Sequence, residues 1–349
     1  MPEPLRIGLV GYGLAGRVFH APLIAAAPDL VVTSVVARDP ERRAAAEREI
    51  PGVRLFENAD QLWGRAQEHD VAVLATPNRL HAPLALAAID AGLHVVIEKP
   101  FTAHAADARS VVDAAQRRGR VLTVFHNRRW DGDFLTVVQV VASDSVGVVT
   151  RLESRIERWQ RDANLSAWRL QAEPDAAGGL LYDLGSHLVD QAIRLFGSPL
   201  SIYAETLRRR PSVMVDDDTF IALEHSGGVY SHLSVSAVAA IPAARFRVLG
   251  FRGAYTKDGL DIQEEQLRGG LQPDAAGFGV EPDTRWGQIT VDGQTRRYPT
   301  LAGRWVDFYP QLADAIRNGG QPPVDPKDAV AVVEVLESAI KSAQRSRGL

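Results

Sequence analysis

The sequence predicts an α/β protein in which a doubly wound parallel sheet precedes a second α+β domain with a large, mainly antiparallel open sheet. Three observations support this. From Arg6 onward, β-rich runs alternate with helical segments, which is typical of βαβ units. After His126 this rhythm changes, and several strand-like runs follow one another without a helix-length segment between them. The length of 349 residues, 46% of them hydrophobic, suits about two domains of roughly 150 residues each.

Six strands are expected in the first part of the chain, each followed by a segment rich in alanine and leucine. They lie at residues 6–10, 31–37, 53–56, 71–75, 94–97 and 121–125. Asp39 and Pro40 predict the start of the second helix, because an acidic cap and a proline at the first helical position favour initiation, and Asn58 is the expected cap of the third. The carboxyl ends of these strands should lie along one edge, where such sheets bind ligands.

The second part of the chain is expected to combine helices with longer strands. Helices are predicted at residues 131–142, 179–196, 304–318 and 325–346, and strands at 148–158, 200–207, 217–225, 229–238 and 244–250. The stretch 260–285 is rich in glycine, proline and acids and long for a compact domain, so a functional loop is predicted. The densest basic run is interpreted as a solvated turn rather than a phosphate-binding patch, and comprises Arg208, Arg209 and Arg210.

The composition excludes several classes of protein. A formal net charge of -4 provides no global positive field for nucleic acid or an anionic membrane. The absence of cysteine excludes disulfides, thiolate catalysis and cysteine-ligated zinc. Residues 1–4 lack the charged and apolar regions of a signal peptide, and no apolar stretch approaches the roughly 20 residues that span a bilayer. We therefore expect a cytoplasmic protein without a nucleic-acid or membrane partner.

A glycine-rich run from Gly11 to Gly16, Gly-Tyr-Gly-Leu-Ala-Gly, directly follows the first expected strand and opens a helix. In this GxGxxG pattern the first glycine permits a tight turn, the second lets backbone amides approach a pyrophosphate, and the third permits close helix packing. The pattern alone is weak, since glycine clusters occur in many turns. Its place between a strand and a helix, with a second βα unit at the expected distance, predicts dinucleotide binding.

The end of the second strand should indicate which dinucleotide binds, because an acid there suits a ribose 2′-hydroxyl and an arginine suits a 2′-phosphate. Asp39 is expected to be occupied as a helix cap, which leaves Arg38 for the nucleotide and favours NADP over NAD. Alternatively, Arg38 lies over the adenine. A Thr-Pro-Asn run at residues 76–78 follows the fourth strand, with His81 nearby, and either lines the nicotinamide half of the crevice or caps the next helix.

Three residues could carry acid–base chemistry. Lys99 follows the fifth strand within Glu98-Lys99-Pro100, at the edge where an open α/β sheet places residues beside its ligand. Asp183 and His187 lie four apart on an expected helix and so share a face. With a nicotinamide cofactor, oxidation of an alcohol needs a base for the hydroxyl proton and a cation for the developing alkoxide. His187 could accept the proton, while Asp183 could hydrogen-bond the imidazole or the substrate.

Spacing alone leaves other interpretations of these residues open. The apolar stripe beside Asp183 and His187 equally fits a polar pair at the edge of a packed helix. Asp190, three residues beyond His187, makes a metal site conceivable, but metal sites normally need more converging ligands, so no metal is predicted. Lys99 by itself could be solvated, as most lysines are.

The combination of GYGLAG, EKP closing the fifth strand and a glycine-rich lead into DLGSHLVD resembles the pattern of the Gfo/Idh/MocA oxidoreductase family. The resemblance runs from Arg6 to about Ala343. Residues 125–135 and 258–266 resemble the branch that contains NADP-dependent scyllo-inositol dehydrogenases. This resemblance implies a dinucleotide-binding Rossmann domain, expected at residues 1–125, and a substrate-binding and oligomerisation domain at residues 126–349, whose last helix is a candidate to pack back on the first domain.

The resemblance also implies roles for individual residues. Lys99 matches the catalytic lysine that contacts the reacting hydroxyl, and Asp183 and His187 match the substrate carboxylate and the general base. Four further residues match positions that tend to line the cofactor and substrate cleft in the family: Asn127, Arg128, Trp168 and Arg169. The expected cofactor-binding set is Gly11, Tyr12, Gly13, Leu14, Ala15, Gly16, Arg38, Thr76, Pro77, Asn78, His81, Glu98, Lys99 and Asn127.

Three functions stay open within such a family. The favoured one is a dehydrogenase that transfers hydride between a ring hydroxyl of a cyclitol or sugar and NADP, or alternatively NAD, because the acid–base set is complete. The others are a nicotinamide-dependent glycosidase and a non-catalytic nucleotide-sensing regulator. The exposed face of the open sheet is commonly an oligomer interface in the family, so a homodimer or homotetramer is implied.

Overall fold

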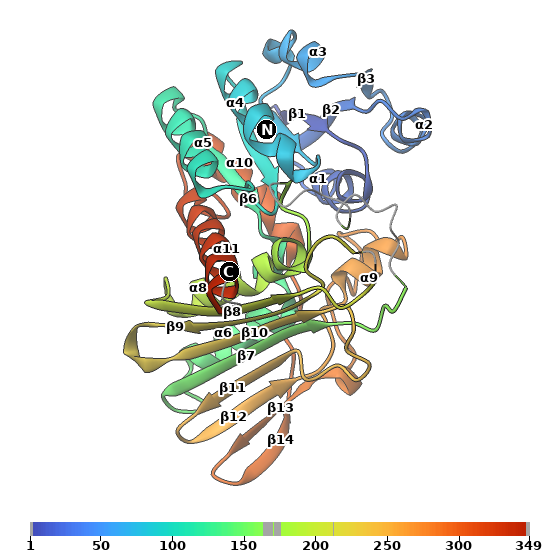
Figure 1. Ribbon diagram of the computed structural model, residues 1–349. Coiled ribbons are helices and arrows are strands. Elements are labelled where there is room, and N and C mark those ends of the chain that lie inside the picture. Colours follow the sequence, from blue (N-terminus) through green and yellow to red (C-terminus); the bar gives the residue numbers. More distant parts are fainter. Residues whose placement is uncertain (1–2, 163–169, 171–175, 212, 347–349) are drawn as a thin grey trace. The chain divides into compact units, whose positions relative to one another are not determined.

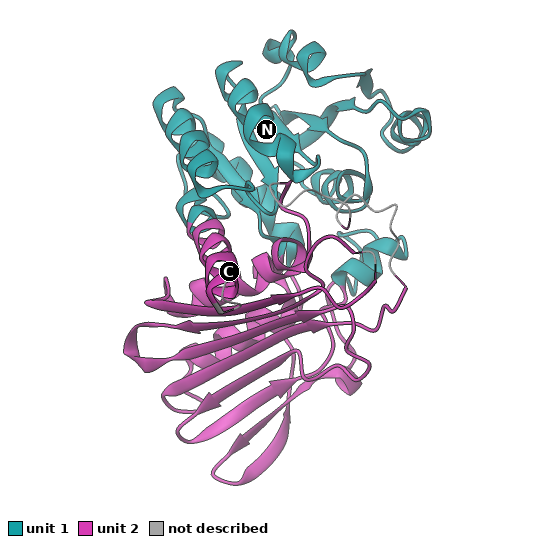
Figure 2. Ribbon diagram, viewed as in Figure 1, with its two compact units in different colours: residues 1–127, 263–278, 304–330 teal, residues 128–262, 279–303, 331–349 magenta. Residues whose placement is uncertain are grey.

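The computed structural model describes residues 3–162, 170, 176–211 and 213–346 (Figure 1). By packing, the chain forms two compact units (Figure 2). Unit 1 comprises residues 1–127, 263–278 and 304–330, and unit 2 comprises residues 128–262, 279–303 and 331–349. The sequence-based division into 1–125 and 126–349 differs from the packing in two respects, because the first boundary lies after residue 127 and two later segments fold with unit 1.

Unit 1 contains a six-stranded sheet in the order β3-β2-β1-β4-β5-β6. Its strands pair in parallel, which confirms the predicted doubly wound sheet. Its described strands are β1 (Leu5–Val10), β2 (Leu30–Val36), β3 (Arg54–Phe56), β4 (Val71–Leu74), β5 (His94–Glu98) and β6 (Leu122–Phe125). Its described α-helices are α1 (Ala21–Ala25), α2 (Pro40–Glu49), α3 (Ala59–Trp63), α4 (His81–Asp90), α5 (Ala105–Arg118), α9 (Gln263–Arg268) and α10 (Phe308–Asn318).

Local signals explain how these helices begin and why the strands are apolar. The carboxylate of Asp39 accepts the N–H of Arg42 at 2.9 Å, and Asn58 caps α3 in the same way, so both predicted caps are confirmed. Val95 and Ile97 of β5 are completely buried, as expected for a parallel strand whose two faces are both covered.

Contacts of β6 show why a distant segment belongs to unit 1. The hydroxyl of Thr123 donates to the carbonyl of Val324 at 2.9 Å and accepts its N–H at 3.1 Å. The rings of Phe125 and Phe308 meet edge to face, with centroids 4.8 Å apart. These partners come from residues 304–330, which periodicity alone cannot assign to the first sheet.

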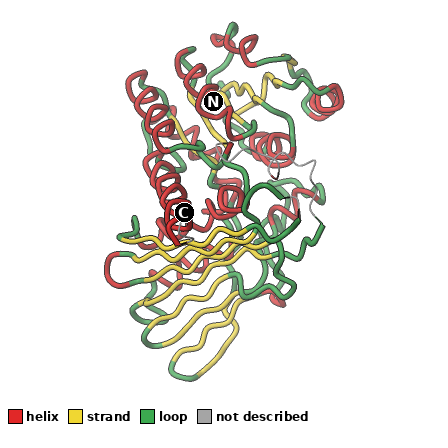
Figure 3. Tube along the Cα trace, viewed as in Figure 1, coloured by secondary structure: helices red, strands yellow, loops and turns green. Residues whose placement is uncertain are grey.

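Unit 2 contains an eight-stranded sheet in the order β14-β13-β12-β11-β7-β10-β9-β8, drawn in yellow in Figure 3. Its pairs are antiparallel apart from β7 with β10, which confirms the predicted, mainly antiparallel sheet. Its strands are β7 (Val149–Glu157), β8 (Ser201–Leu207), β9 (Asp218–Glu224), β10 (Tyr230–Ser236), β11 (Phe246–Gly250), β12 (Gly253–Lys257), β13 (Gly287–Val291) and β14 (Gln294–Tyr298). Its described helices are α6 (Gly132–Ala142), α8 (Ser186–Phe196) and most of α11 (Pro326–Ser346).

The strands β12, β13 and β14 were not predicted. The last two form a hairpin around Asp292 and Gly293, whose φ angles are 48° and 79°. An Asp-Gly pair with two positive φ angles is the turn that favours a two-residue hairpin, so this part of the sheet had a readable sequence signal. The predicted loop 260–285 is partly helical, because it contains α9.

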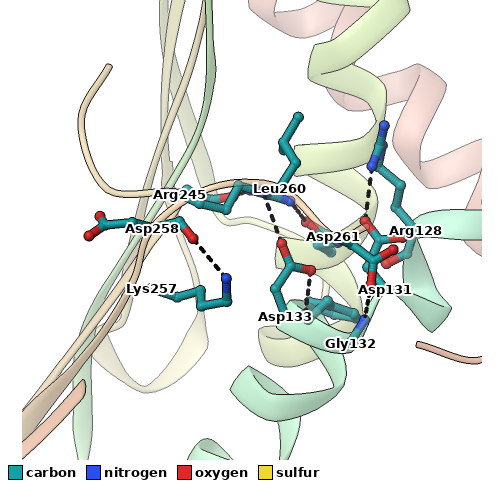
Figure 4. Close-up of polar contacts among 12 residues, drawn as sticks. Arg128, Asp131, Gly132, Asp133, Arg245, Lys257, Asp258, Leu260 and Asp261 are labelled. Atoms are coloured by element: carbon teal, nitrogen blue, oxygen red, sulfur yellow. Dashed lines mark hydrogen bonds and ion pairs between the residues drawn. The ribbon is translucent and has the colours of Figure 1, made fainter. Parts of the chain in front are cut away.

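A buried charged cluster lies in unit 2, where α6 begins (Figure 4). Asp261 accepts the N–H of Gly132 at 2.7 Å, and Arg128 pairs with Asp131 at 3.0 Å. Arg245 lies 3.5 Å from Asp133. Because these charges are removed from water, each needs its partner, and the cluster fixes the first turn of α6. In the described part of the chain no helix is long and apolar enough to cross a membrane.

Candidate functional site

Three glycines lie in or directly after the turn that follows β1. The fold leaves no room for a side chain at two of them and leaves room at the third. A Cβ on Gly11, whose φ is 102°, would lie 2.3 Å from the carbonyl oxygen of Ala75. A Cβ on Gly16 would lie 2.1 Å from the carbonyl oxygen of Gly11. A Cβ on Gly13 would meet only the guanidinium of Arg42, at 3.6 Å. The space above Gly13 is therefore open, as a turn that receives a pyrophosphate requires.

The helix after this turn starts with a π-helical segment, η1 (Ala15–His20). Leu14 precedes it and is 45% exposed, whereas Tyr12 is buried. The Tyr12 hydroxyl donates to Glu49 at 3.1 Å, which ties the turn to the end of α2. Burial and the Glu49 carboxylate raise the pKa of Tyr12, so the phenol keeps its proton.

A cavity of about 420 Å³ in unit 1 adjoins this turn. Its lining includes Gly11, Thr76 and three arginines, Arg38, Arg42 and Arg79. Asp39 is occupied as the cap of α2, as expected from the sequence. The turn, the arginines and the cavity fit the phosphates and adenosine of a dinucleotide cofactor.

Two of the polar residues that follow β4, Asn78 and His81, are buried in unit 1. His81 is completely buried, with Nδ1 at 2.9 Å from the carbonyl oxygen of Pro100 and Nε2 at 2.9 Å from that of Thr76. Burial lowers the pKa of His81, although the backbone carbonyls oppose this effect. Asn78 is 8% exposed, and no side chain caps α4 at Leu80. His81 thus joins the ends of β4 and β5, and contact of residues 76–78 with a cofactor stays a prediction.

Lys99 lies directly after β5 and is half-buried. The carboxylate of Glu98 accepts the N–H of Lys99 at 3.0 Å through Oε2. Its Oε1 lies 3.1 Å from Nε2 of His20, and Nδ1 of that ring lies 2.6 Å from the Tyr309 hydroxyl. His20 and Tyr309 were not predicted as site residues from the sequence. His20 is the last residue of η1, the segment that follows the glycine turn, which was a weak signal, whereas nothing local indicated Tyr309.

Asp183 and His187 lie in unit 2, on two successive helical segments. Asp183 belongs to a π-helical segment, η6 (Leu181–Gly185), and His187 is the second residue of α8. A π-turn changes the angular offset between residues four apart, so the α-helical face assumed from spacing does not strictly apply, and π-bulges are frequent at functional sites. Asp183 is half-buried and His187 is 4% exposed.

Asp216 anchors the start of these helices. Its carboxylate accepts the N–H of Leu181 at 2.7 Å, and its backbone carbonyl accepts that of Leu180 at 3.0 Å. A Cβ on Gly179, whose φ is 89°, would lie 2.0 Å from the Asp216 carboxylate. Burial raises the pKa of Asp216 to about 6, although hydrogen bonds from Leu181 and Thr219 lower it. Asp216 was not singled out from the sequence, although it begins a run of three acids.

Asp183 lines a cavity of about 580 Å³ in unit 2, together with Arg158, Trp159 and Arg210. Trp159 is 53% exposed and offers an aromatic surface. Arg210 is 8% exposed and pairs with Asp217 at 2.9 Å, so the predicted solvated turn is wrong for this residue, because Asp217 draws its guanidinium inward. Arg208 and Arg209 are exposed, as predicted. Trp168 and Arg169 lie outside the described residues.

The alternative of a metal site at Asp190 finds no support. Arg129 binds the Asp190 carboxylate through two nitrogens, with contacts of 2.7 Å and 2.9 Å. Among the described residues, no group of three or more histidine, aspartate or glutamate side chains could hold a metal ion. Asn127 and Arg128, the other predicted cleft residues, are 7% and 6% exposed, and Arg128 pairs with Asp131.

The predicted catalytic residues are thus distributed over both units. Lys99 and the nucleotide turn belong to unit 1, whereas Asp183 and His187 belong to unit 2. The cavity in unit 1 is lined by the nucleotide turn and Arg38, and the cavity in unit 2 is lined by Asp183.

Comparison with known proteins agrees with this description. Residues 5–126 match the Gfo/Idh/MocA profile described as "Oxidoreductase family, NAD-binding Rossmann fold", and residues 134–256 match the family's C-terminal domain. The chain belongs to the Gfo/Idh/MocA family, and it is an oxidoreductase with an NAD-binding Rossmann domain.

Two relatives and one solved structure illustrate the similarity. The uncharacterized oxidoreductase YdgJ of Escherichia coli is 38% identical, covering 99% of this chain and 98% of its own. The scyllo-inositol 2-dehydrogenase (NADP(+)) IolW of Bacillus subtilis is 29% identical, covering 99% and 95%. The solved structure of yvaA from Bacillus subtilis has a TM-score of 0.93 at 29% identity, covering 99% and 97%.

Proposed function

We propose that this protein is a dehydrogenase that transfers a hydride between a ring hydroxyl of a cyclitol or sugar and NADP. The observation that carries the proposal is the cavity of about 580 Å³ in unit 2, whose wall combines the carboxylate of Asp183 with the indole of Trp159. Polyols present hydroxyls to carboxylates and C–H faces to aromatic rings, and this pocket offers both. Full-length similarity to a scyllo-inositol dehydrogenase supports the substrate class.

The proposed chemistry assigns one task to each residue. His187 accepts the proton of the reacting hydroxyl, the ammonium of Lys99 stabilises the negative charge that develops on its oxygen, and Asp183 orients the substrate or the imidazole. The bound nicotinamide cofactor supplies the hydride acceptor. In the reverse direction His187 acts as the acid. The proposal requires Lys99 of unit 1 and His187 of unit 2 to reach the same oxygen.

Preference for NADP over NAD is proposed from the cavity in unit 1. Arg38 and Arg42 line it together with the carboxylate of Glu57, and Asp39 is engaged as a helix cap, so the two guanidiniums that follow β2 support a contact with a 2′-phosphate. Arg43 is engaged elsewhere, because its guanidinium donates to the carbonyls of Ala37 and Phe56. It therefore holds the ends of β2 and β3 together and is not assigned to the nucleotide.

Self-association through the open sheet is the remaining part of the proposal. Burial alternates along β9, and its outward residues include Phe220, whose ring lies 5.7 Å from that of His232 on β10. Tyr203 and Tyr230 on neighbouring strands are 46% and 42% exposed. An aromatic group on an exposed sheet face suits a homodimer or homotetramer, which sedimentation of the wild type and of Tyr230→Glu would test. The cysteine-free sequence favours the cytoplasm.

The test is a panel of inositols and aldoses assayed with NAD and NADP separately, followed by the absorbance of the reduced cofactor. We expect turnover of at least one cyclitol or sugar, with a higher kcat/KM for NADP. Nucleotide binding without turnover across the panel would instead indicate a sensor. Release of sugar from a glycoside without net cofactor reduction would indicate a glycosidase.

A further inference from the structure

A buried polar chain in unit 1 joins three elements at the residue before Lys99. The hydroxyl of Tyr309 on α10 lies 2.6 Å from Nδ1 of His20, and Nε2 of His20 lies 3.1 Å from Oε1 of Glu98. Tyr309 and His20 are completely buried, and Glu98 is 8% exposed. The second carboxylate oxygen of Glu98 accepts the backbone N–H of Lys99 at 3.0 Å. The chain therefore ends on the peptide group of the predicted catalytic lysine.

The Glu98 carboxylate sets the direction of the hydrogen bond from His20. A carboxylate can only accept, so Nε2 of His20 carries a proton and donates it to Oε1 of Glu98. Burial, followed by the charge of Glu98, raises the pKa of Tyr309 well above its usual value, so the phenol keeps its proton beside Nδ1 of His20. Both carboxylate oxygens of Glu98 are thus used, one by a side chain and the other by the backbone.

The charge of Glu98 depends on this arrangement. Burial by itself raises the pKa of the Glu98 carboxyl, but the hydrogen bond and charge of His20, followed by the charges of Lys99 and His81, lower the pKa below its usual value. The groups that face this carboxylate are His20 from η1, Tyr309 from α10 through His20, His81 from α4 and Lys99 beside it. Without His20, burial would favour the neutral acid.

We propose that His20 and Tyr309 are positioning residues for Lys99, acting through Glu98. Tyr309 holds His20, His20 holds Oε1 of the carboxylate, and Oε2 accepts the N–H of Lys99, so the direction in which the lysine side chain leaves β5 is set as a result. His20 is also the last residue of η1, the π-helical segment that follows the glycine turn, so the same chain connects that segment to the lysine. The inference rests on the proposed function only in taking Lys99 as the catalytic cation.

Kinetics of full-length variants provide the first test. Because small misplacement of a catalytic group is costly, we expect Tyr309→Phe to lower kcat about fivefold and His20→Asn to lower it about thirtyfold, with NADP affinity within about twofold of wild type. In His20→Asn, kcat should also fall at a higher pH on the acid side, because Glu98 then protonates more readily. The matched control is His69→Asn, since His69 is 4% exposed and bridges Ser34 and the Arg65 carbonyl away from Lys99.

A second test needs no turnover. The chain has only four lysines, Lys99, Lys257, Lys327 and Lys341, so ¹³C-dimethylation of the full-length protein gives a few resolvable NMR signals. Lys99→Arg assigns the signal of Lys99. We expect Tyr309→Phe and His20→Asn to shift that signal and leave those of the exposed Lys327 and Lys341 in place, and His69→Asn to shift none. Lys257 is 1% exposed and paired with Glu281, so it is not expected to react.

The outcomes of the two tests separate the proposals. A shifted Lys99 signal together with a wild type that turns over no polyol would overturn the dehydrogenase assignment and retain the positioning role. An unmoved Lys99 signal in both variants would overturn the positioning role, whatever the kinetics. So would a kcat loss in His69→Asn equal to that in His20→Asn.

Discussion

Lys99 and the pair formed by Asp183 and His187 are supported in different ways by their two units. Side chains from η1 and α10 converge on Glu98, the residue before Lys99, and the support consists of a completely enclosed chain of polar groups. The helices that carry Asp183 and His187 are held at two points instead, by Asp216 at the start of η6 and by the pair of Arg129 with Asp190 about one turn after His187.

This difference predicts whether substitutions in each unit mainly affect catalysis or stability. The buried polar chain ends on the peptide group of Lys99 and positions only that side chain. Its loss should therefore lower kcat more than it lowers the free energy of unfolding. A helix that is clamped at two places is part of the core of unit 2, so loss of a clamp should affect stability first. Variants in each region can therefore separate the two kinds of support.

The largest expected effect concerns the reacting groups themselves. Lys99→Ala and His187→Ala should each lower kcat by at least about a hundredfold while NADP still binds, because each removes a group that acts on the reacting hydroxyl. Steady-state kinetics and titration of NADP check this. Lys327→Ala, at an exposed lysine, is the control for the first variant. Near-normal rates in either active-site variant would remove that residue from the scheme.

The second largest expected effect concerns the pair of Arg129 with Asp190, which holds α8. Asp190→Asn should lower the free energy of unfolding by about 2 kcal/mol, because it leaves the Arg129 guanidinium buried beside a neutral amide. Urea denaturation measures the change. The exposed pair of Arg252 with Asp144, whose side chains are 56% and 70% exposed, supplies the control Asp144→Asn, for which we expect less than about 0.5 kcal/mol. Equal losses would contradict the clamp.

Nucleotide affinity should change in a variant of unit 1 whose stability is unchanged. Arg38→Ala should weaken NADP binding about tenfold and leave NAD binding nearly unchanged, because a charge-assisted contact to the 2′-phosphate is lost. Calorimetric titration with both nucleotides checks the ratio. Arg48→Ala on the same helix as Arg42, at a side chain that is 66% exposed, is the control. An equal loss of affinity for both nucleotides would indicate that Arg38 lies over the adenine instead.

The smallest expected effect is a pH dependence in unit 2. The pKa of Asp216 is raised from 3.8 to about 6, so the folded state binds this proton more tightly than the unfolded state does. The stability from protonated Asp216 is full below pH 3.8 and is lost as the pH rises through about 6. Asp216→Asn should reduce that slope by about 1 kcal/mol per pH unit between the two pKa values. Urea midpoints at pH 4.5, 5.5 and 7 test this, and an unchanged slope would contradict it.

Much of unit 1 was predictable because its information is local. Hydrophobic runs of strand length, Asp39 and Asn58 as caps, and glycines at a turn each act within a few residues. Unit 2 was harder to read, and β12 to β14 were missed although Asp292 and Gly293 marked a hairpin. The return of residues 263–278 and 304–330 to unit 1 depends on partners such as Thr123 and Val324, which no periodicity connects.

The candidate site shows the same division. Lys99 and the glycine turn were found because their position at strand ends is visible in sequence. Tyr309, Asp216 and Arg129 were not found, because each acts on a residue far away in the chain and has no spacing of its own. Arg210 was misinterpreted for a related reason. A basic run looks solvated unless the carboxylate that turns one of its members inward, here Asp217, is known.

The hydrogen bonds between Thr123 and Val324 join residues 201 positions apart, which has a consequence for biosynthesis. When β6 leaves the ribosome, the segment that covers Phe125 and completes the partners of His20 is still untranslated. Proteins generally fold from the N-terminus as they are made, but this sheet must wait with an open side until nearly the whole chain has emerged. Shortened versions that stop soon after residue 127 should therefore be caught by chaperones or aggregate.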